Sequence, residues 1–120
     1  MLEIERLDHV LITIPPNSRD EARKFYTEVL LLKEIPGNHP NGAIWVQLGD
    51  IELHIREEEI HQANSGRHPG LVVKDLDQAK AFLQKATIEL SYSSVIEGRS
   101  RCFFRDPWGN RFELIEFDRK

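Results

Sequence analysis

The stretch Asp106-Pro-Trp-Gly-Asn-Arg-Phe-Glu-Leu114 decides the fold of this chain. Its Asp-Pro-Trp-Gly-Asn start is typical of a tight turn, and the residues after it are typical of a strand. The turn therefore predicts a hairpin between strands at residues 101–105 and 111–117. The first half of the chain contains a shorter stretch of the same kind, Gly49-Asp-Ile-Glu-Leu53, in which Gly49-Asp50 joins two apolar segments. Both stretches end in Glu-Leu, which indicates an internal repeat.

The two halves of the chain repeat one order of motifs, which predicts two similar modules. Each half has a β-branched segment that begins with His, then an Asp-x-Ala-x-x-Phe motif, then the strand with Glu-Leu. These are residues 9–14, 20–25 and 51–55 in the first half, and residues 68–73, 77–82 and 111–117 in the second. A strand, a helix and further strands, twice over, predict an α+β fold with the helices on the outer side of curved sheets.

Capping signals set the expected ends of the two helices. Ser18 with Glu21 forms a capping box, so the first helix is expected to begin near Arg19. Asp75 with Gln78 caps the second helix in the same way. Weaker patterns predict strands at residues 43–48 and 90–96. Together these elements place module 1 at about residues 5–57, a polar linker at 58–67 and module 2 at about 68–118, within a single domain of residues 1–120.

Composition excludes several classes of partner. The chain has 120 residues and a net charge of −4, so nucleic acid is a poor partner because binding it needs a basic face. The single cysteine, Cys102, cannot build a disulfide framework or a cysteine-based zinc site, and it favours a reducing, cytoplasmic setting. No apolar run is long enough for a membrane span, and the acidic start does not fit a signal peptide.

The repeat pairs His9 with His68 and Glu52 with Glu113, and these four side chains form the candidate metal site. Two imidazoles and two carboxylates suit Zn²⁺, Ni²⁺, Co²⁺, Mn²⁺ or Fe²⁺ and lack the thiolates of a structural zinc site. With water in place of one Glu, the set becomes the two-His, one-carboxylate triad of non-haem iron enzymes. Glu52 or Glu113 is the expected catalytic proton carrier.

Four more residues are candidates for substrate contact. His54 lies two positions after Glu52, so both project from one face of a strand. His54 is open to three roles, as a metal ligand, a partner of a ligand or a substrate contact. Gln47 and Trp45 come from the preceding strand, and Arg101 is a cation near the last hairpin. By contrast, His39 and His61 are expected to be plain surface residues.

The sequence resembles the vicinal-oxygen-chelate superfamily, which includes glyoxalases, bleomycin-resistance proteins and extradiol dioxygenases, over nearly its whole length. The resemblance rests on residues 7–10, 22–30, 51–53, 68–73 and 106–114. It implies two tandem βαβββ modules that form a curved, partly open mixed β-barrel with helices outside. It also implies a homodimer, with the modules paired within one chain or between two. Leu31 departs from the family by standing where Gly is common, and Pro69 removes a strand N–H beside His68.

Different branches of the family imply different site chemistry. The glyoxalase I branch implies metal ligands at His9, Glu52, His68 and Glu113, and the dioxygenase and fosfomycin-resistance branches imply the same set without Glu52. The bleomycin-resistance branch binds its drug without metal. We expect a metal-dependent, cytoplasmic, lyase- or isomerase-type enzyme for a small substrate with vicinal oxygens. The alternatives are a metal-free drug or metabolite binder, a dioxygenase and an antibiotic thiol transferase.

Overall fold

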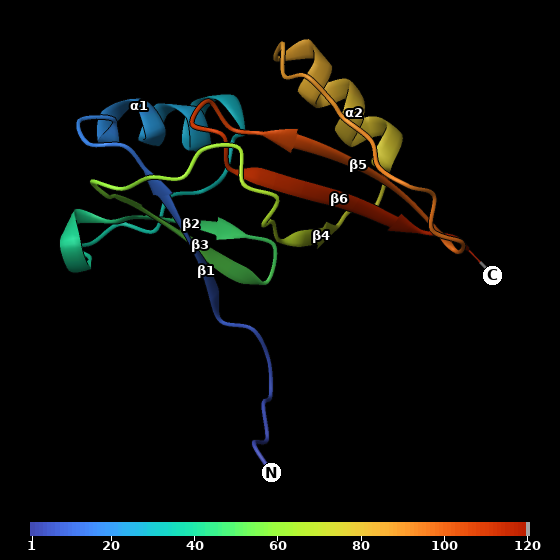
Figure 1. Cartoon of the computed structure of the whole chain (residues 1–120), viewed down its shortest axis with the longest axis horizontal. Coiled ribbons are helices and arrows are strands. Elements are labelled where there is room, and N and C mark those ends of the chain that lie inside the picture. The colour runs from blue at the N-terminus through green and yellow to red at the C-terminus, as the bar shows by residue number, and fades with distance from the viewer. Residues whose placement is uncertain (120) are drawn as a thin grey trace. The chain divides into compact units, whose positions relative to one another are not determined.

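The computed structural model describes residues 1–119 and divides into two compact units, Met1–His61 and Gln62–Lys120. Among residues 1–119, each unit has a three-stranded sheet and one α-helix, so the fold is mixed α+β, as predicted (Figure 1). Within residues 1–119, no helix is both long enough and apolar enough to cross a membrane.

The sheet of unit 1 has the strand order β1-β3-β2. Strand β1 (His9–Ile14) runs parallel to β3 (Ile51–Glu57), and β2 (Ile44–Leu48) runs antiparallel to β3. The register pairs His9 with Glu52 and Trp45 with His54. Paired residues point to the same side of a sheet, so the sheet has one polar and one apolar face.

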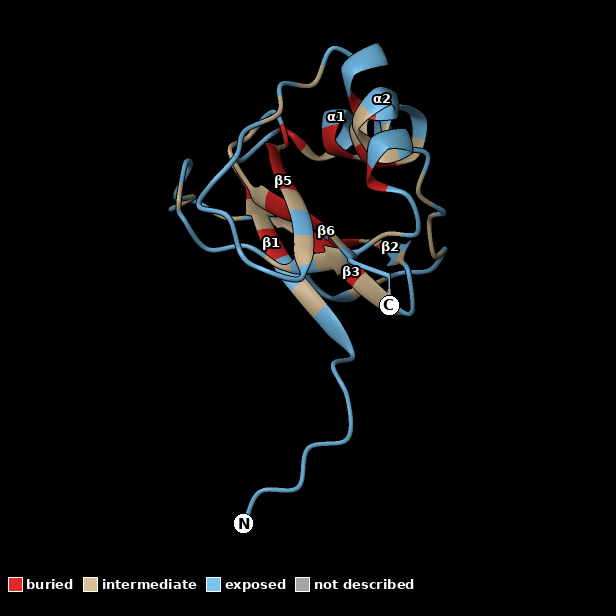
Figure 2. Cartoon of the chain, turned by 90° about the vertical axis from the view of Figure 1, so that its right-hand side faces the viewer, coloured by how far each residue is buried: buried red, intermediate tan, exposed pale blue. Residues whose placement is uncertain are grey.

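The apolar face of this sheet forms the core of unit 1. Alternate positions of the three strands are buried there, together with two residues of the helical segment: Ile12, Ile14, Ile44, Val46, Leu53, Ile55, Ala22 and Tyr26. Buried positions lie along the strands, whereas the helices expose much of their surface (Figure 2). Because the apolar face packs inward, the polar face is left to carry the candidate site residues.

Helix α1 (Arg19–Lys24) begins at the predicted residue, but its cap differs from the prediction. The Ser18 side chain makes no capping bond and instead donates to the carbonyl of Pro15. The Glu57 carboxylate accepts hydrogen bonds from the N–H groups of Ser18 and Arg19, at 2.9 and 3.1 Å. A carboxylate at the end of β3 thus caps the helix in place of the local capping box. Its negative charge is also stabilised by the positive end of the helix dipole.

A π-helical turn (Phe25–Val29) continues α1, and Leu31 follows it with φ at 59°. This leucine therefore adopts the left-handed conformation that favours glycine, the residue that is common here in the family. A short 3₁₀ turn (Pro40–Gly42) leads into β2.

Unit 2 repeats the topology with the strand order β4-β6-β5. Strand β4 (Gly70–Val72) is parallel to β6 (Arg111–Phe117), and β5 (Arg99–Arg105) is antiparallel to β6. Helix α2 (Leu76–Lys85) contacts β5 and β6, and its predicted cap is present, since Asp75 accepts from the N–H of Gln78 at 2.9 Å. The predicted Asp106–Asn110 turn is also present: the Asp106 carboxylate accepts from the N–H groups of Trp108 and Asn110.

Three local predictions are corrected by the structure. The predicted strand at residues 90–96 is reduced to a single bridge between Ser91 and Phe103, and in unit 1 the segment after the helical region likewise makes one bridge, from Glu34 to Val46. Glu57 belongs to β3, which extends beyond the predicted end at residue 55.

The third correction concerns the repeat itself. Gly70, not His68, occupies the position that corresponds to His9, because Gly70 pairs with Glu113 as His9 pairs with Glu52. His68 lies two residues before β4, on the far side of Pro69. Proline lacks the N–H of a regular strand residue, which fits a short strand that begins late at a sheet edge.

Candidate functional site

A stack of four aromatic rings crosses the polar face of unit 1. The ring of His54 lies between those of His9 and Trp45, with centroids 4.1 and 3.9 Å away. His39 covers the other face of Trp45 at 4.0 Å. The register explains the order, since these rings come from the neighbouring strands β1, β3 and β2 and from the loop before β2. His39 is therefore part of the site architecture, which corrects its prediction as a plain surface residue.

Asp8 orients the His9 imidazole. Its Oδ2 lies 3.0 Å from Nδ1 of His9, and this hydrogen bond is the main reason that the pKa of Asp8 lies below its ordinary value. The ionised carboxylate only accepts, so Nδ1 carries a proton, and a neutral ring then presents the lone pair of Nε2. A carboxylate on one nitrogen is the arrangement that commonly orients a metal-binding or basic histidine.

Glu52 and His54 form a second carboxylate–imidazole pair on the same face. Oε1 of Glu52 lies 2.9 Å from Nε2 of His54, and the His54 side chain is buried. His54 is thus held from both faces by stacked rings and at one edge by a carboxylate. Gln47 is placed elsewhere: its amide donates to the carbonyls of Gly49 and Ile51 and so supports the hairpin turn.

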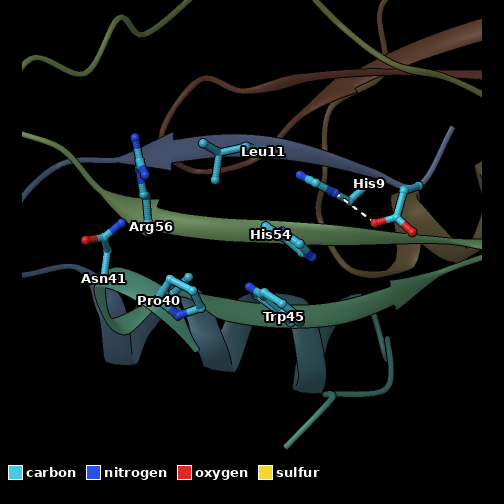
Figure 3. A pocket seen from close by; sticks show the side chains of 9 residues that line it. His9, Leu11, Pro40, Asn41, Trp45, His54 and Arg56 are labelled. Carbon is cyan, nitrogen blue, oxygen red and sulfur yellow. Dashed lines mark hydrogen bonds and ion pairs between the residues drawn. The ribbon is translucent and has the colours of Figure 1, made fainter. Parts of the chain in front are cut away.

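A pocket of about 350 Å³ opens on this face within unit 1 (Figure 3). His9, Leu11, Asn41, Trp45, His54 and Arg56 are among its lining residues. Its volume is at the small end of the range of ligand pockets in proteins. The pocket joins predicted residues to three polar residues that sequence reasoning missed, Asp8, Asn41 and Arg56.

In unit 2, the Glu113 carboxylate is held at both oxygens. Nε2 of His68 lies 2.9 Å from Oε1, and Nη1 of Arg101 donates to Oε2 at 3.1 Å. Burial acts to raise the pKa of Glu113, but the hydrogen bonds from Arg101 and His68 outweigh it and hold the pKa below its ordinary value. Arg101 is itself fixed by a bond to the carbonyl of Ser94.

Gly70 makes room for this arrangement. A β-carbon at Gly70 would lie 3.3 Å from the Ile115 side chain and 3.9 Å from Oε1 of Glu113. The smallest residue therefore stands beside Glu113, and His68 reaches the carboxylate from outside the strand.

The proton positions on His68 point to a cation beside it. Its Nδ1 lies 2.8 Å from the carbonyl of Gly66, which only accepts, so Nδ1 carries a proton. A neutral ring then has only a lone pair at Nε2, and this lone pair faces the ionised Oε1 of Glu113. Two such acceptors at 2.9 Å repel unless a cation lies between them, either a second ring proton or a metal ion. Two ligand atoms of one metal ion, each about 2.1 Å from it and at right angles, are about 3 Å apart.

The four predicted ligands provide donor atoms that suit a divalent metal, but each unit provides only two of them. His9 and Glu52 in unit 1, and His68 and Glu113 in unit 2, each provide one nitrogen and one carboxylate. Within residues 1–119, no three His, Cys, Asp or Glu side chains are grouped closely enough to hold an ion. Neither pair is therefore a complete site by itself. Cys102 contributes nothing to the set, because it is buried and its thiol pKa is raised by that burial.

Two of the three missed residues, Asp8 and Arg56, had a signal in the sequence, and Asn41 had none. Asp8 is adjacent to His9, so its role as an orienting carboxylate could have been inferred from that neighbour. Asn41 lies in a Pro-Asn-Gly turn, and Arg56 lies two positions after His54 on the same face of β3. The alternation that selected Glu52 and His54 extends to Arg56 and could have found it.

Comparisons with known proteins establish the family. The Glyoxalase/Bleomycin resistance protein/Dioxygenase superfamily model matches residues 6–114, so the chain belongs to this superfamily. The crystal structure of a putative glyoxalase family protein from Bacillus anthracis is similar, with 31% identity and a TM-score of 0.88 over 98% of this chain and 99% of that chain. No curated protein sequence matches the chain.

Two other solved structures share the fold. A glyoxalase family protein from Enterococcus faecalis has 26% identity and a TM-score of 0.75, covering 93% of this chain and 98% of that chain. Lactoylglutathione lyase from Agrobacterium tumefaciens has 18% identity and a TM-score of 0.74, covering 97% and 100% of the two chains. At 18% identity the likeness concerns the fold alone.

Proposed function

We propose that this protein is a divalent-metal-dependent enzyme of the lyase or isomerase type that acts on a small substrate with two neighbouring oxygens. The proposed ligands are His9, Glu52, His68 and Glu113. The observation that carries the proposal is the 2.9 Å approach of Nε2 of His68 to Oε1 of Glu113 while Nδ1 donates to a carbonyl. This spacing matches two ligands of one ion, and it leaves room for a cation between two acceptors.

Three of the proposed ligands have hydrogen-bond partners of the kind that usually orient metal ligands. Asp8 orients His9, the Gly66 carbonyl orients His68, and Arg101 holds the second oxygen of Glu113. Such outer contacts fix ring orientation and ligand direction. A bound divalent ion would supply Lewis acidity toward the paired oxygens of a substrate and stabilise the anion that forms.

Proton movement is assigned to Glu52. One oxygen of this carboxylate accepts from His54, and the other has no hydrogen-bond partner among residues 1–119. The free oxygen can take a proton from a carbon next to the paired oxygens, and His54 steadies the carboxylate during the transfer. Glu113 is the poorer base, because Arg101 and His68 both stabilise its ionised form.

A metal-free binding protein is the second candidate, and the Arg101–Glu113 ion pair favours it. The two side chains are only 12% and 10% exposed, so Glu113 already has a buried counter-charge without any metal. In this case the Arg101 guanidinium balances the Glu113 charge without a metal ion, and the unit 1 pocket holds the ligand.

Elemental analysis separates the two candidates. Protein stripped with a chelator and reloaded with Zn²⁺, Ni²⁺, Co²⁺, Mn²⁺ or Fe²⁺ is expected to retain about one ion per site. His68→Gln and Glu113→Gln should lose the ion, whereas Glu59→Gln, an exposed carboxylate, should keep it. The loaded protein should then be screened with methylglyoxal–thiol adducts, catechols and fosfomycin. Failure to retain any of the five metals, with the fold intact, would reject the enzyme and leave the binder.

A further inference from the structure

The pocket of unit 1 has one end that the proposed metal ligands do not use. Figure 3 shows Arg56 and Asn41 at this end and His9 at the other, with His54 and Trp45 between them. Leu11 lines the pocket from β1. The pocket therefore offers a cation and an amide at a distance from the imidazole that the proposed chemistry requires.

Arg56 keeps part of its guanidinium available. Its Nε and Nη2 both donate to a single oxygen, Oε1 of Glu58, at 3.1 and 2.7 Å. Nη1 has no acceptor within residues 1–119. The Arg56 and Glu58 side chains are 34% and 37% exposed, and an ion pair this exposed contributes only about 0–1 kcal/mol. An incoming anion can therefore share or replace Glu58 at little cost.

Asn41 is held in position by its backbone. It has φ at 56°, in the left-handed region that asparagine tolerates better than most residues. The turn around it is closed by the Ala43 N–H on the Pro40 carbonyl at 3.1 Å, and Arg19 anchors the Gly42 carbonyl at 2.7 Å. The Asn41 side-chain amide has no partner within the described residues, so its N–H groups are available to a ligand in the pocket that it lines.

The ring stack decides how a ligand can be recognised. Both faces of Trp45 are covered, by His39 and His54, and both faces of His54 are covered, by Trp45 and His9. No further ring can stack on either residue. Only ring edges remain, including the Trp45 indole N–H, which has no acceptor within residues 1–119. Stacking of a large flat ring on Trp45 or His54 is therefore excluded, and these two residues can contact a ligand only at their edges.

We propose that this pocket binds a small acid, with its carboxylate or phosphonate oxygens at Arg56, Asn41 and the Trp45 N–H. The substrate would then carry an acidic group at the end opposite the two oxygens that are directed toward His9. This statement about the substrate rests on the proposed function, whereas the anion site rests on the geometry of unit 1 alone.

The test uses the full chain without metal and reads the fluorescence of Trp45. Trp108→Phe removes the other tryptophan, so the remaining emission reports on the pocket. Chelator-treated protein is titrated with glycerate, methylphosphonate and the neutral glyceramide. Both anions should change the emission in a saturable way that weakens with added salt, and glyceramide should bind at least about tenfold more weakly.

Four variants in this background sharpen the test. Arg56→Gln should weaken glycerate binding about tenfold or more, and Asn41→Gly, which suits the left-handed backbone, about threefold to tenfold. Glu58→Gln frees Arg56 and should tighten binding about twofold to fivefold, a gain that a purely structural role of this residue would not give. Arg67→Gln, an exposed arginine of unit 2, is the matched control and should change nothing.

The outcomes separate this inference from the proposed function. Equal binding of glycerate and glyceramide, or unchanged binding in Arg56→Gln, overturns the anion site whatever metal the protein holds. A preference for one anion over the other identifies the acidic group as carboxylate or phosphonate. If the protein binds the anions as described but retains no metal on loading, the anion site is supported and the proposed metal-dependent enzyme is rejected.

Discussion

Replacement of Arg101 by Gln tests how the Glu113 carboxylate is stabilised. Nη1 of Arg101 donates to Glu113 at 3.1 Å, and both side chains are nearly buried, at 12% and 10% exposure. Glutamine removes the positive charge beside Glu113 and leaves His68 as the remaining side-chain contact of this carboxylate within residues 1–119. Loss of a charge-assisted hydrogen bond to a buried carboxylate is expected to cost about 2–3 kcal/mol of unfolding free energy at neutral pH.

The cost should depend on pH in a defined direction. The folded-state pKa of Glu113 lies below its ordinary value of 4.5 because the hydrogen bonds of Arg101 and His68 outweigh the effect of burial. A lowered folded pKa gives stability that is fully present above the unfolded value and is lost as pH falls through the folded value. The difference between the wild type and Arg101→Gln should therefore be largest at neutral pH and shrink below pH 4.5.

Urea unfolding of chelator-treated protein, followed by tryptophan fluorescence at several pH values, measures this difference. Arg67→Gln removes an exposed arginine of the same unit and should change stability by less than about 0.5 kcal/mol. A cost for Arg101→Gln as small as that of the control, or a cost that stays constant as Glu113 becomes protonated, would refute the reasoning.

Three further substitutions test local features of the fold. Glu57→Gln weakens the cap of α1 and should cost about 1 kcal/mol in urea unfolding, compared with no change for the exposed Glu59→Gln. Leu31→Gly relieves a left-handed leucine that is 66% exposed and should raise the unfolding free energy by about 0.5–1 kcal/mol, measured in the same way. Asp106→Ala removes the acceptor that holds the last turn and should lower the thermal midpoint, with a loss of about 2–3 kcal/mol.

A different result would contradict each of these three predictions. Equal stability of the Glu57 and Glu59 variants would mean that water caps the helix as well as the carboxylate does. A destabilised Leu31→Gly would mean that the leucine side chain contributes more than its backbone conformation costs. An unchanged midpoint for Asp106→Ala would show that proline and glycine alone hold the turn.

The fold was predictable from the sequence because local and periodic signals agreed. The Asp106–Asn110 turn, the Asp75 cap and the alternation within β3 each depend on neighbours a few residues apart, and the structure contains all three. The Ser18 capping box failed because a distant carboxylate, Glu57, competes for the same N–H groups. Such a competitor is close only in the folded chain, so a local pattern cannot reveal it.

The candidate site was predictable only where strand alternation applies. Glu52 and His54 share a face as expected, and His9 joins them through the β1–β3 register. The correspondence of His9 with His68 was wrong by two positions, because short motifs align without regard to the backbone pairing that Gly70 adopts. The ring of His39 lies in a loop with no periodicity, so nothing in the sequence placed it on Trp45.

X-ray absorption spectroscopy of the metal-loaded protein measures the proposed ligand set most directly. Two imidazoles in the first coordination shell are expected, together with oxygen ligands at about 2.0–2.2 Å, and His9→Ala and His68→Ala should each reduce the imidazole count by one. A shell of oxygen alone, or one that neither substitution alters, would contradict the assignment of these histidines to the metal.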